Sequence, residues 1–289
     1  MIRTNQDNLV RISVVGKVDQ PRMPDVPALP YFVDADGKAY LLPMYGGLIY
    51  NVRLGDSVDR WAAEMIQPGA SIRNEVEGEN AALRALSCLG NRARIVSGAA
   101  TGKTGIVTGK SGRFLEQVIC DFSVETLNLM APGDNVLVEA YGTGLHLIDY
   151  PEIHLRSCSP LLLDSLSIHE EKLGDGFTLS VRHELPGEAA GAGAGLSEYG
   201  PIGIQMSIAS SYLDNELCFG DLVLIKDWDS TYSHGRFKER SSIGVVCQGN
   251  SLRGGHGPGV LVFMSGPSAE LRPLISDEAN IGTKFVNNK

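Results

Sequence analysis

The segment KDWDSTYSHGR holds the densest group of side chains that could bind a metal ion or transfer protons. Side chains in a strand repeat with period two, so Asp227 and Asp229 share one face if the apolar run LVLI continues as a strand to Trp228. With His234 they form a ligand set for Mn²⁺, Zn²⁺ or Mg²⁺, or a pair that divides acid and base roles. A solvated strand end with turn-forming Asp and Ser explains the same residues without chemistry.

A second group of candidate residues lies in the glycine-rich segment RGGHGPG. Glycines let a backbone approach a ligand closely, so we expect Gly255 and Gly257 to contact a substrate. The histidine between them, His256, is free on such a loop to act as a catalytic acid or a further metal ligand. The alternative is a connecting turn with an incidental histidine.

The segment 187–200, GEAAGAGAGLSEYG, is the one low-complexity stretch of the chain. Such a sequence cannot pack a core, and it is typical of a mobile loop. The functional alternative is a lid that becomes ordered over a ligand, with Ser197 and Tyr199 as substrate contacts.

The elements that must position these residues are mostly short strands, because thirty-four glycines and fourteen prolines divide the 289 residues into short pieces. Three helices are expected, at 77–89, 124–130 and 160–167; Ser123 and Ser159 are placed to cap the last two. The strand-like runs are rich in Val, Ile and aromatic residues, and they fall at 9–15, 39–42, 48–52, 93–96, 105–108, 117–121, 135–140, 177–182, 222–226, 242–247 and 260–264. The pattern predicts a mainly β, β-rich α+β protein with few short helices.

A phrase that carries a Gly-Asp pair recurs at Gly55-Asp56, Gly133-Asp134 and Gly220-Asp221. Each pair is typical of a β-turn, and the last two precede similar alternating apolar runs. One interpretation is two related β-units. We therefore expect a small barrel-like N-terminal half, 1–156, and a second barrel-like or sandwich-like half, 157–289.

The segment 91–122 resembles the KOW motif of small SH3-like barrels in ribosomal proteins and transcription factors. The resemblance implies RNA or ribosomal-protein contacts through Lys103, Lys110 and Arg113. Tight turns in a small barrel explain its glycines equally well. The formal net charge of −9 disfavours nucleic acid as a partner, because acidic proteins repel polyanions at long range.

Composition sets further limits on the class of protein. The chain is 43% apolar and 20% charged, as in globular proteins, and no apolar run is long enough for a spanning helix. Five scattered cysteines without a CxxC pair argue against a disulfide framework and a cysteine-rich zinc site. We expect a cytoplasmic protein that makes no membrane contact, and a homo-oligomer, because exposed edges of short strands pair between subunits.

Taken together, seven phrases resemble an uncharacterised prokaryotic family that is known as a domain of unknown function. The resemblance covers nearly the whole chain and implies a two-part, mainly β architecture, but no activity. Within it, Asp227, Asp229, Tyr232 and His256 fall in the most recognisable phrases, and Tyr232 joins the catalytic candidates on that ground. The phrases are LVRISVVGKVDQPR, MYGGLIYNV, PGASIRNE, VSGAATGKTGIVTGKSG, PGDNVLVEAYGTGLHLIDYP, FGDLVLIKDWDSTYSHG and GGHGPGVLVFMS.

Three hypotheses for function follow from these residues. The first is a metal-assisted hydrolase or lyase of a small polar metabolite, with Asp227 and Asp229 as metal ligands or base and His256 as ligand or acid. Its Gly-Asp, strand, Asp order is similar to metal-dependent formamidases and acetamidases, which is a fold-level analogy. The second is a KOW-like binding module. The third is a non-catalytic, small-molecule-binding oligomer.

Overall fold

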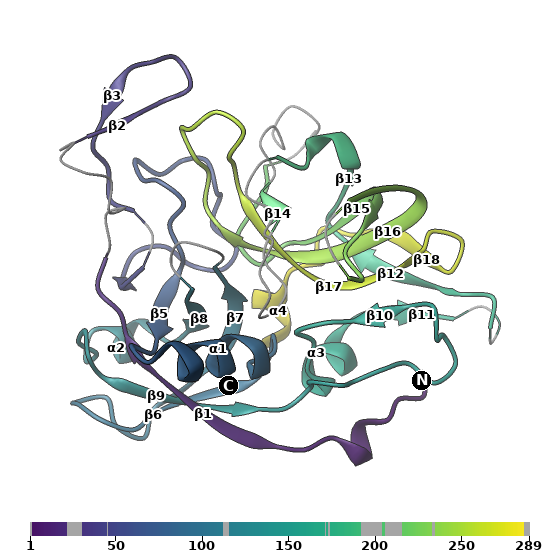
Figure 1. The fold of residues 1–289 in the computed structure, drawn as a ribbon, viewed down its shortest axis with the longest axis horizontal. Helices are drawn as coiled ribbons and strands as arrows, with labels where there is room; N and C mark the ends of the chain where they lie inside the picture. The colour runs from purple at the N-terminus through teal and green to yellow at the C-terminus, as the bar shows by residue number, and fades with distance from the viewer. Residues whose placement is uncertain are drawn as a thin grey trace.

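The protein is built from two β-rich layers, and this confirms the mainly β fold expected from the sequence (Figure 1). Strands β1 and β5–β9 form the lower layer in that view, and β12–β18 form the upper one. The computed structural model describes residues 2–21, 31–44, 46–111, 116–170, 172, 174–191, 204–205, 216–232 and 235–285.

The lower layer is a closed six-stranded sheet in the order β1-β9-β6-β7-β8-β5, completed by antiparallel pairing of β1 with β5. The 91–122 segment supplies three of its strands, so it shares a larger barrel and does not form a separate small one. The strands are β1 (Ile12–Val18), β5 (Gly69–Arg73), β6 (Arg92–Ile95), β7 (Thr104–Lys110), β8 (Val118–Asp121) and β9 (Asn135–Ala140), and β4 (Leu48–Ile49) pairs with β5.

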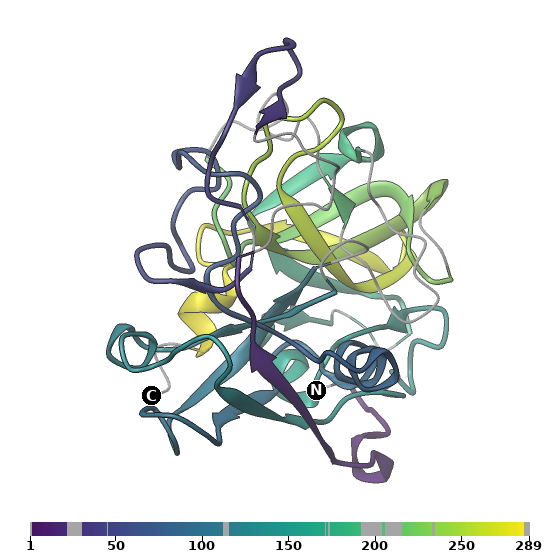
Figure 2. The ribbon, with the colours of Figure 1, turned by 60° about the vertical axis from the view of Figure 1, so that its left-hand side comes forward.

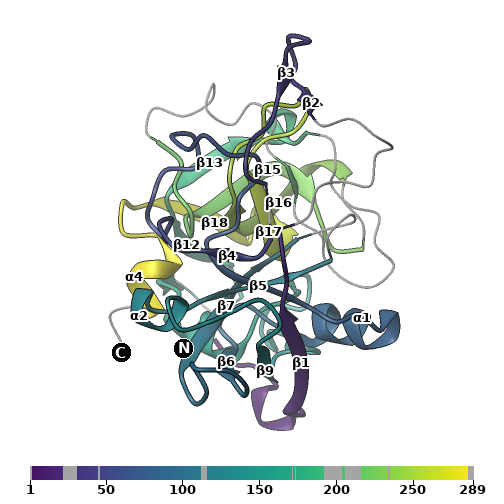
Figure 3. The same cartoon turned by 90° about the vertical axis from the view of Figure 1, so that its left-hand side faces the viewer.

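The interior of this barrel is apolar, and helix α1 (Glu77–Leu86) contributes Leu83 to it. A Cβ atom on Gly16 of β1 would lie 2.8 Å from Leu83 Cδ2, so the missing side chain at this position lets the helix approach the strand. Figure 3 shows α1 on one side of the barrel, and α2 (Val124–Leu127) and α4 (Ile281–Phe285) on the other.

The upper layer is a six-stranded sheet packed against a three-stranded one through a shared apolar core. The larger sheet runs β10-β17-β16-β15-β13, with β14 also on β17, and the smaller is β11-β12-β18. Their bounds are β10 (His154–Leu155), β11 (Ile168–His169), β12 (Phe177–Val181), β13 (His183–Pro186), β14 (Ile204–Gln205), β15 (Leu222–Asp229), β16 (Gly235–Gln248), β17 (Gly259–Pro267) and β18 (Leu271–Ile275). The third expected helix is α3 (Pro160–Ser165).

The three Gly-Asp turns have the same local geometry. Gly55, Gly133 and Gly220 have φ values of 91°, 94° and 88°, which favour glycine. In each turn an aspartate carboxylate accepts a hydrogen bond from the backbone N–H three residues earlier, at 2.8–2.9 Å. The first and third turns also bond to each other, because Gly55 N donates to Phe219 O and Phe219 N donates to Asp56 O. The first and third turns therefore join the two layers.

A short hairpin, β2 (Phe32–Val33) and β3 (Ala39–Tyr40), stands clear of both layers in Figure 2. It is held to the 249–258 loop, because Ala35 N donates to Leu252 O and the Arg253 guanidinium lies 4.6 Å from the Phe32 ring centre. No helix in the described ranges combines the length and the apolar character that crossing a bilayer requires.

Candidate functional site

Asp227 and Asp229 do not follow the regular alternation that would place them on one face of a strand. Strand β15 does continue to Asp229, but a bulge at Asp227, with φ of 51°, breaks the period of two. The Asp227 carboxylate accepts from Glu239 N at 3.1 Å, whereas Asp229 forms an ion pair with Arg240 and accepts from Thr231 N. Each aspartate therefore already stabilises the β15–β16 hairpin.

His256 lies far along the sheet from this pair. Asp229 pairs with Gly235 at one end of β16, and the His256 loop follows Gln248 at the other end. The part of β15 that lies between them, from Leu222 to Asp229, alone spans about 23 Å at about 3.3 Å per residue. His256 Nδ1 lies 3.1 Å from Gly254 O. Within the described ranges, no three His, Cys, Asp or Glu side chains gather as a metal site.

The remaining candidates are dispersed. Tyr232 is 86% exposed and its ring lies 5.9 Å from that of His154. Gly255 is exposed with a positive φ, and Gly257 is buried. Lys103 is exposed on a turn, but Lys110 is 3% exposed, and a buried ammonium cannot contact a nucleic acid. His234, Ser197, Tyr199 and Arg113 lie outside the described residues, as does most of 187–200.

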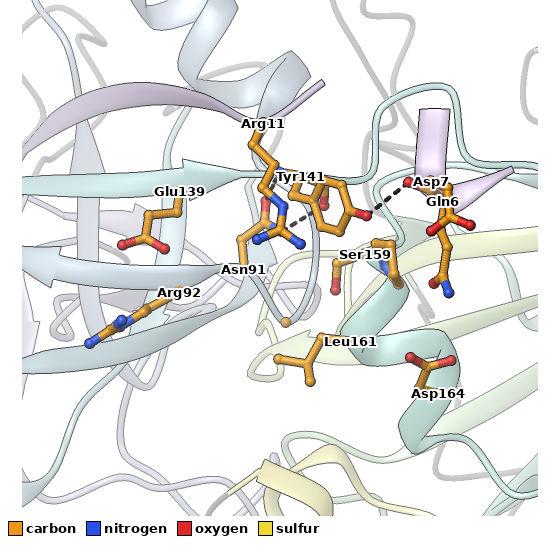
Figure 4. A pocket seen from close by; sticks show the side chains of 12 residues that line it. Gln6, Asp7, Arg11, Asn91, Arg92, Glu139, Tyr141, Ser159, Leu161 and Asp164 are labelled. Atoms are coloured by element: carbon orange, nitrogen blue, oxygen red, sulfur yellow. Dashed lines mark hydrogen bonds between the residues drawn. The ribbon is translucent and has the colours of Figure 1, made fainter. Parts of the chain in front are cut away.

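The structure instead presents a polar cavity of about 420 Å³ at the edge of the barrel (Figure 4). Its walls come from the N-terminal segment, β6, β9 and the first turn of α3, which are far apart in the sequence. Ten side chains are labelled in the close-up: Gln6, Asp7, Arg11, Asn91, Arg92, Glu139, Tyr141, Ser159, Leu161 and Asp164.

The Arg11 guanidinium is stacked on the Tyr141 ring, 4.3 Å from its centre. The ladder explains the contact, since Ile12 pairs with Ala140 and the next residues outward are Arg11 and Tyr141. The tyrosine is itself held, because its hydroxyl donates to Gln6 O at 2.9 Å. Stacking fixes the plane of the guanidinium and leaves its N–H groups free at the edge.

Arg92 and Glu139 occupy the same wall, on the left in Figure 4. Because Ala93 pairs with Val138, Arg92 and Glu139 are opposite each other one step along the ladder. Asp7 and Asp164 lie at the other end, on the right. The cavity therefore has a cationic end that is partly offset by one carboxylate, and an anionic end.

The floor of the cavity is rigid. Asn91 is 3% exposed; its Oδ1 accepts from Cys88 N at 2.7 Å, and its Nδ2 donates to Tyr141 O at 2.8 Å. Ser159 caps α3, as expected from the sequence, by accepting from Leu162 N at 3.0 Å. The Asn91 bonds join the turn before β6 to the end of β9, and Ser159 N, which donates to Leu89 O at 3.3 Å, joins α3 to the same turn.

Sequence reasoning missed this site because its residues carry no local motif. Arg11 precedes a strand, Tyr141 follows another, and only the register brings them together. The one available signal was Ser159, the cap of an expected helix.

Comparison with known proteins places the chain in a family. Family models described as domain of unknown function (DUF4438), N-terminal and C-terminal, match residues 31–164 and 165–285. A crystal structure of TM1086 superposes with a TM-score of 0.92 at 35% identity, covering 98% of this chain and 99% of that one. Among curated proteins no match is found. Because the two domain models together match residues 31–285, the chain belongs to the DUF4438 family.

Proposed function

We propose that the protein binds a small zwitterionic metabolite in the cavity beside Arg11, with a carboxylate at the Arg11 end and an amine at the Asp7 end. The observation that carries the proposal is the Arg11–Tyr141 stack. A guanidinium held flat presents parallel N–H donors, and these match the two oxygens of a carboxylate.

The charges of the cavity support an ionic ligand. Neither Arg11 nor Arg92 forms an ion pair among the salt bridges of the described chain, although Glu139 is near. Two cations facing a cavity, with one carboxylate, Glu139, beside them, leave a net positive charge that favours an incoming anion. At the opposite end, Asp7 and Asp164 favour a cationic group.

The size of the cavity also limits the ligand. A volume of about 420 Å³ lies at the small end of the range of about 300–1,000 Å³ for ligand pockets. Charged side chains lie at both ends of the cavity, so an ionic metabolite fits better than a lipid.

The test is a thermal-shift and calorimetric panel of four probes: 4-aminobutyrate and lysine as ligands with both charges, glutarate as a dicarboxylate and cadaverine as a diamine. We expect 4-aminobutyrate and lysine, which carry both a positive and a negative charge, to stabilise the protein. Glutarate and cadaverine, the two controls, should bind at least ten-fold more weakly. Arg11→Met should abolish the effect, whereas Arg94→Met, on β6 but outside the cavity, should retain it. Equal binding of all four probes, or none, contradicts the proposal.

The hydrolase and the RNA-binding proposals have less support. The first needs Asp227, Asp229 and His256 to act together, and β16 holds them apart. The RNA-binding proposal rests on Lys103, Lys110 and Arg113. Of the two that the structure describes, only Lys103 is exposed. Self-association stays a prediction that a sedimentation measurement can test.

A further inference from the structure

Lys110, the last residue of β7, is buried without an acidic partner. Its side chain is 3% exposed, and Nζ donates to Ser157 Oγ at 2.6 Å. No carboxylate forms an ion pair with it among the residues that the structure describes. Burial therefore lowers the pKa of Lys110 to about 8, so about a tenth of the side chains carry a neutral amine at pH 7 and most do above pH 8.

The charged groups around Lys110 are mainly cationic. After burial, the largest effect on the pKa of Lys110 comes from Cys88, which raises it, and Arg84 of α1 and Arg156, which precedes Ser157, both lower it. Arg84 is paired with Glu116 at 3.0 Å, and Arg156 donates to the backbone oxygen of Ser230. The positive charges of Arg84 and Arg156 would favour an anionic group formed at Lys110 Nζ.

The thiol of Cys88 does not supply that anion. Its side chain is 1% exposed, and burial raises its pKa, so it stays a neutral thiol at physiological pH. The amine is the nucleophile of this cluster.

We propose that Lys110 is a carboxylation site, at which the neutral amine adds carbon dioxide to form a carbamate. The nitrogen lone pair forms the N–C bond, a C=O π pair moves to oxygen, and one amine proton leaves to solvent. The product retains one N–H, which can still donate to Ser157 Oγ, and carries one negative charge near Arg84 and Arg156. Carbon dioxide suits the position because it is small and uncharged, and reaching an amine that is 3% exposed requires both properties.

This inference is independent of the cavity beside Arg11, and its test uses a different probe. The full-length protein is equilibrated with ¹³C-bicarbonate at about pH 8.5, where the amine is largely neutral, and a carbamate carbon signal is sought by NMR. We expect a lysine carbamate signal of about one equivalent per chain. The signal should be lost in Lys110→Met and kept in Lys103→Met, which removes an exposed lysine.

The site is assigned without a variant by unfolding the wild-type adduct in the presence of a trimethyloxonium salt, which methylates the carbamate oxygen once the side chain is exposed, and by mapping the peptides by mass. This step separates Lys110 from the α-amino group, which also forms carbamates, and it stands even if Lys110→Met fails to fold. A modified Lys110 peptide supports the proposal. An unmodified Lys110 peptide at saturating bicarbonate, or a lysine signal that survives in a folded Lys110→Met protein, overturns it.

Discussion

The three Gly-Asp turns allow one structural element to be perturbed in two environments. The change is Asp221→Asn, with Asp56→Asn as its matched control, because both carboxylates accept from the backbone N–H three residues earlier. Asparagine keeps the shape of the side chain and removes its charge. The two variants therefore differ in burial and partners, not in local geometry.

The expected magnitudes follow from those partners. Asp221 is 1% exposed, accepts from Asn280 Nδ2 and Cys218 N at 2.8 Å each, and lies 3.5 Å from Arg182 Nε. Removing one member of a buried charged network costs about 3–5 kcal/mol of folding stability. In Asp221→Asn, the new side-chain NH₂ group would face an N–H donor, and the Arg182 guanidinium would lose its carboxylate partner. Asp56 is 26% exposed at its side chain, so water can replace its bonds and the cost is about 1 kcal/mol.

The assay is urea unfolding at neutral pH followed by tryptophan fluorescence, for which Trp228 on β15 reports on the strand that follows Asp221. We expect Asp221→Asn to be less stable than Asp56→Asn by at least about 2 kcal/mol in free energy of unfolding. If the two variants lose the same stability, the buried network at the third turn is not what stabilises the joint between the layers, and the reasoning fails.

Three further predictions concern other parts of the chain. Gly16→Ala should cost about 1–3 kcal/mol by overpacking against Leu83, and a Leu83→Ala partner in a double-mutant cycle should show a coupling energy; additive effects would refute the contact. In the native protein the pKa of Lys110 is about 8, below its ordinary value of 10.5, so between these pH values the unfolded chain binds one proton more than the native protein. In buffer free of carbon dioxide, the free energy of unfolding should therefore rise with pH across this window, by up to roughly 3 kcal/mol relative to Lys110→Met. Parallel pH curves for the two proteins would contradict that assignment. All five cysteines should react slowly with a thiol reagent in the native protein, because four are buried and burial raises the pKa of the half-buried Cys218 to about 11; rapid labelling of any one of them would contradict this.

The sequence predicted elements best where their pattern was local. Strand β9 has the expected bounds of 135–140, and Ser123 and Ser159 cap the helices as anticipated. Strands such as β5 and β18 were missed. Strand β18 gains its hydrogen bonds from a parallel partner, β12, about ninety residues earlier, and such pairing leaves no short-range signal.

The candidate site was harder to predict for a related reason. The period-two argument for Asp227 and Asp229 holds for a regular strand, but Asp227 has a φ of 51° at an irregularity, where one residue of β15 stands opposite the four residues 237–240 of β16. Lys110 was expected at an accessible turn, yet β7 continues to it and it lies buried beside Ser157. Arg11 and Tyr141 meet only because β1 and β9 adopt one register out of several that their sequences allow.

The most direct test of the central claim is an isothermal titration of 4-aminobutyrate into the wild-type protein and into Arg11→Met. The stacked guanidinium should supply a charge-assisted contact of about 1.5–3 kcal/mol, so the account predicts measurable binding to the wild type and a loss of ten-fold or more in the variant. Binding that is unchanged in Arg11→Met would contradict the account, as would the absence of binding by any ligand with both charges in the panel.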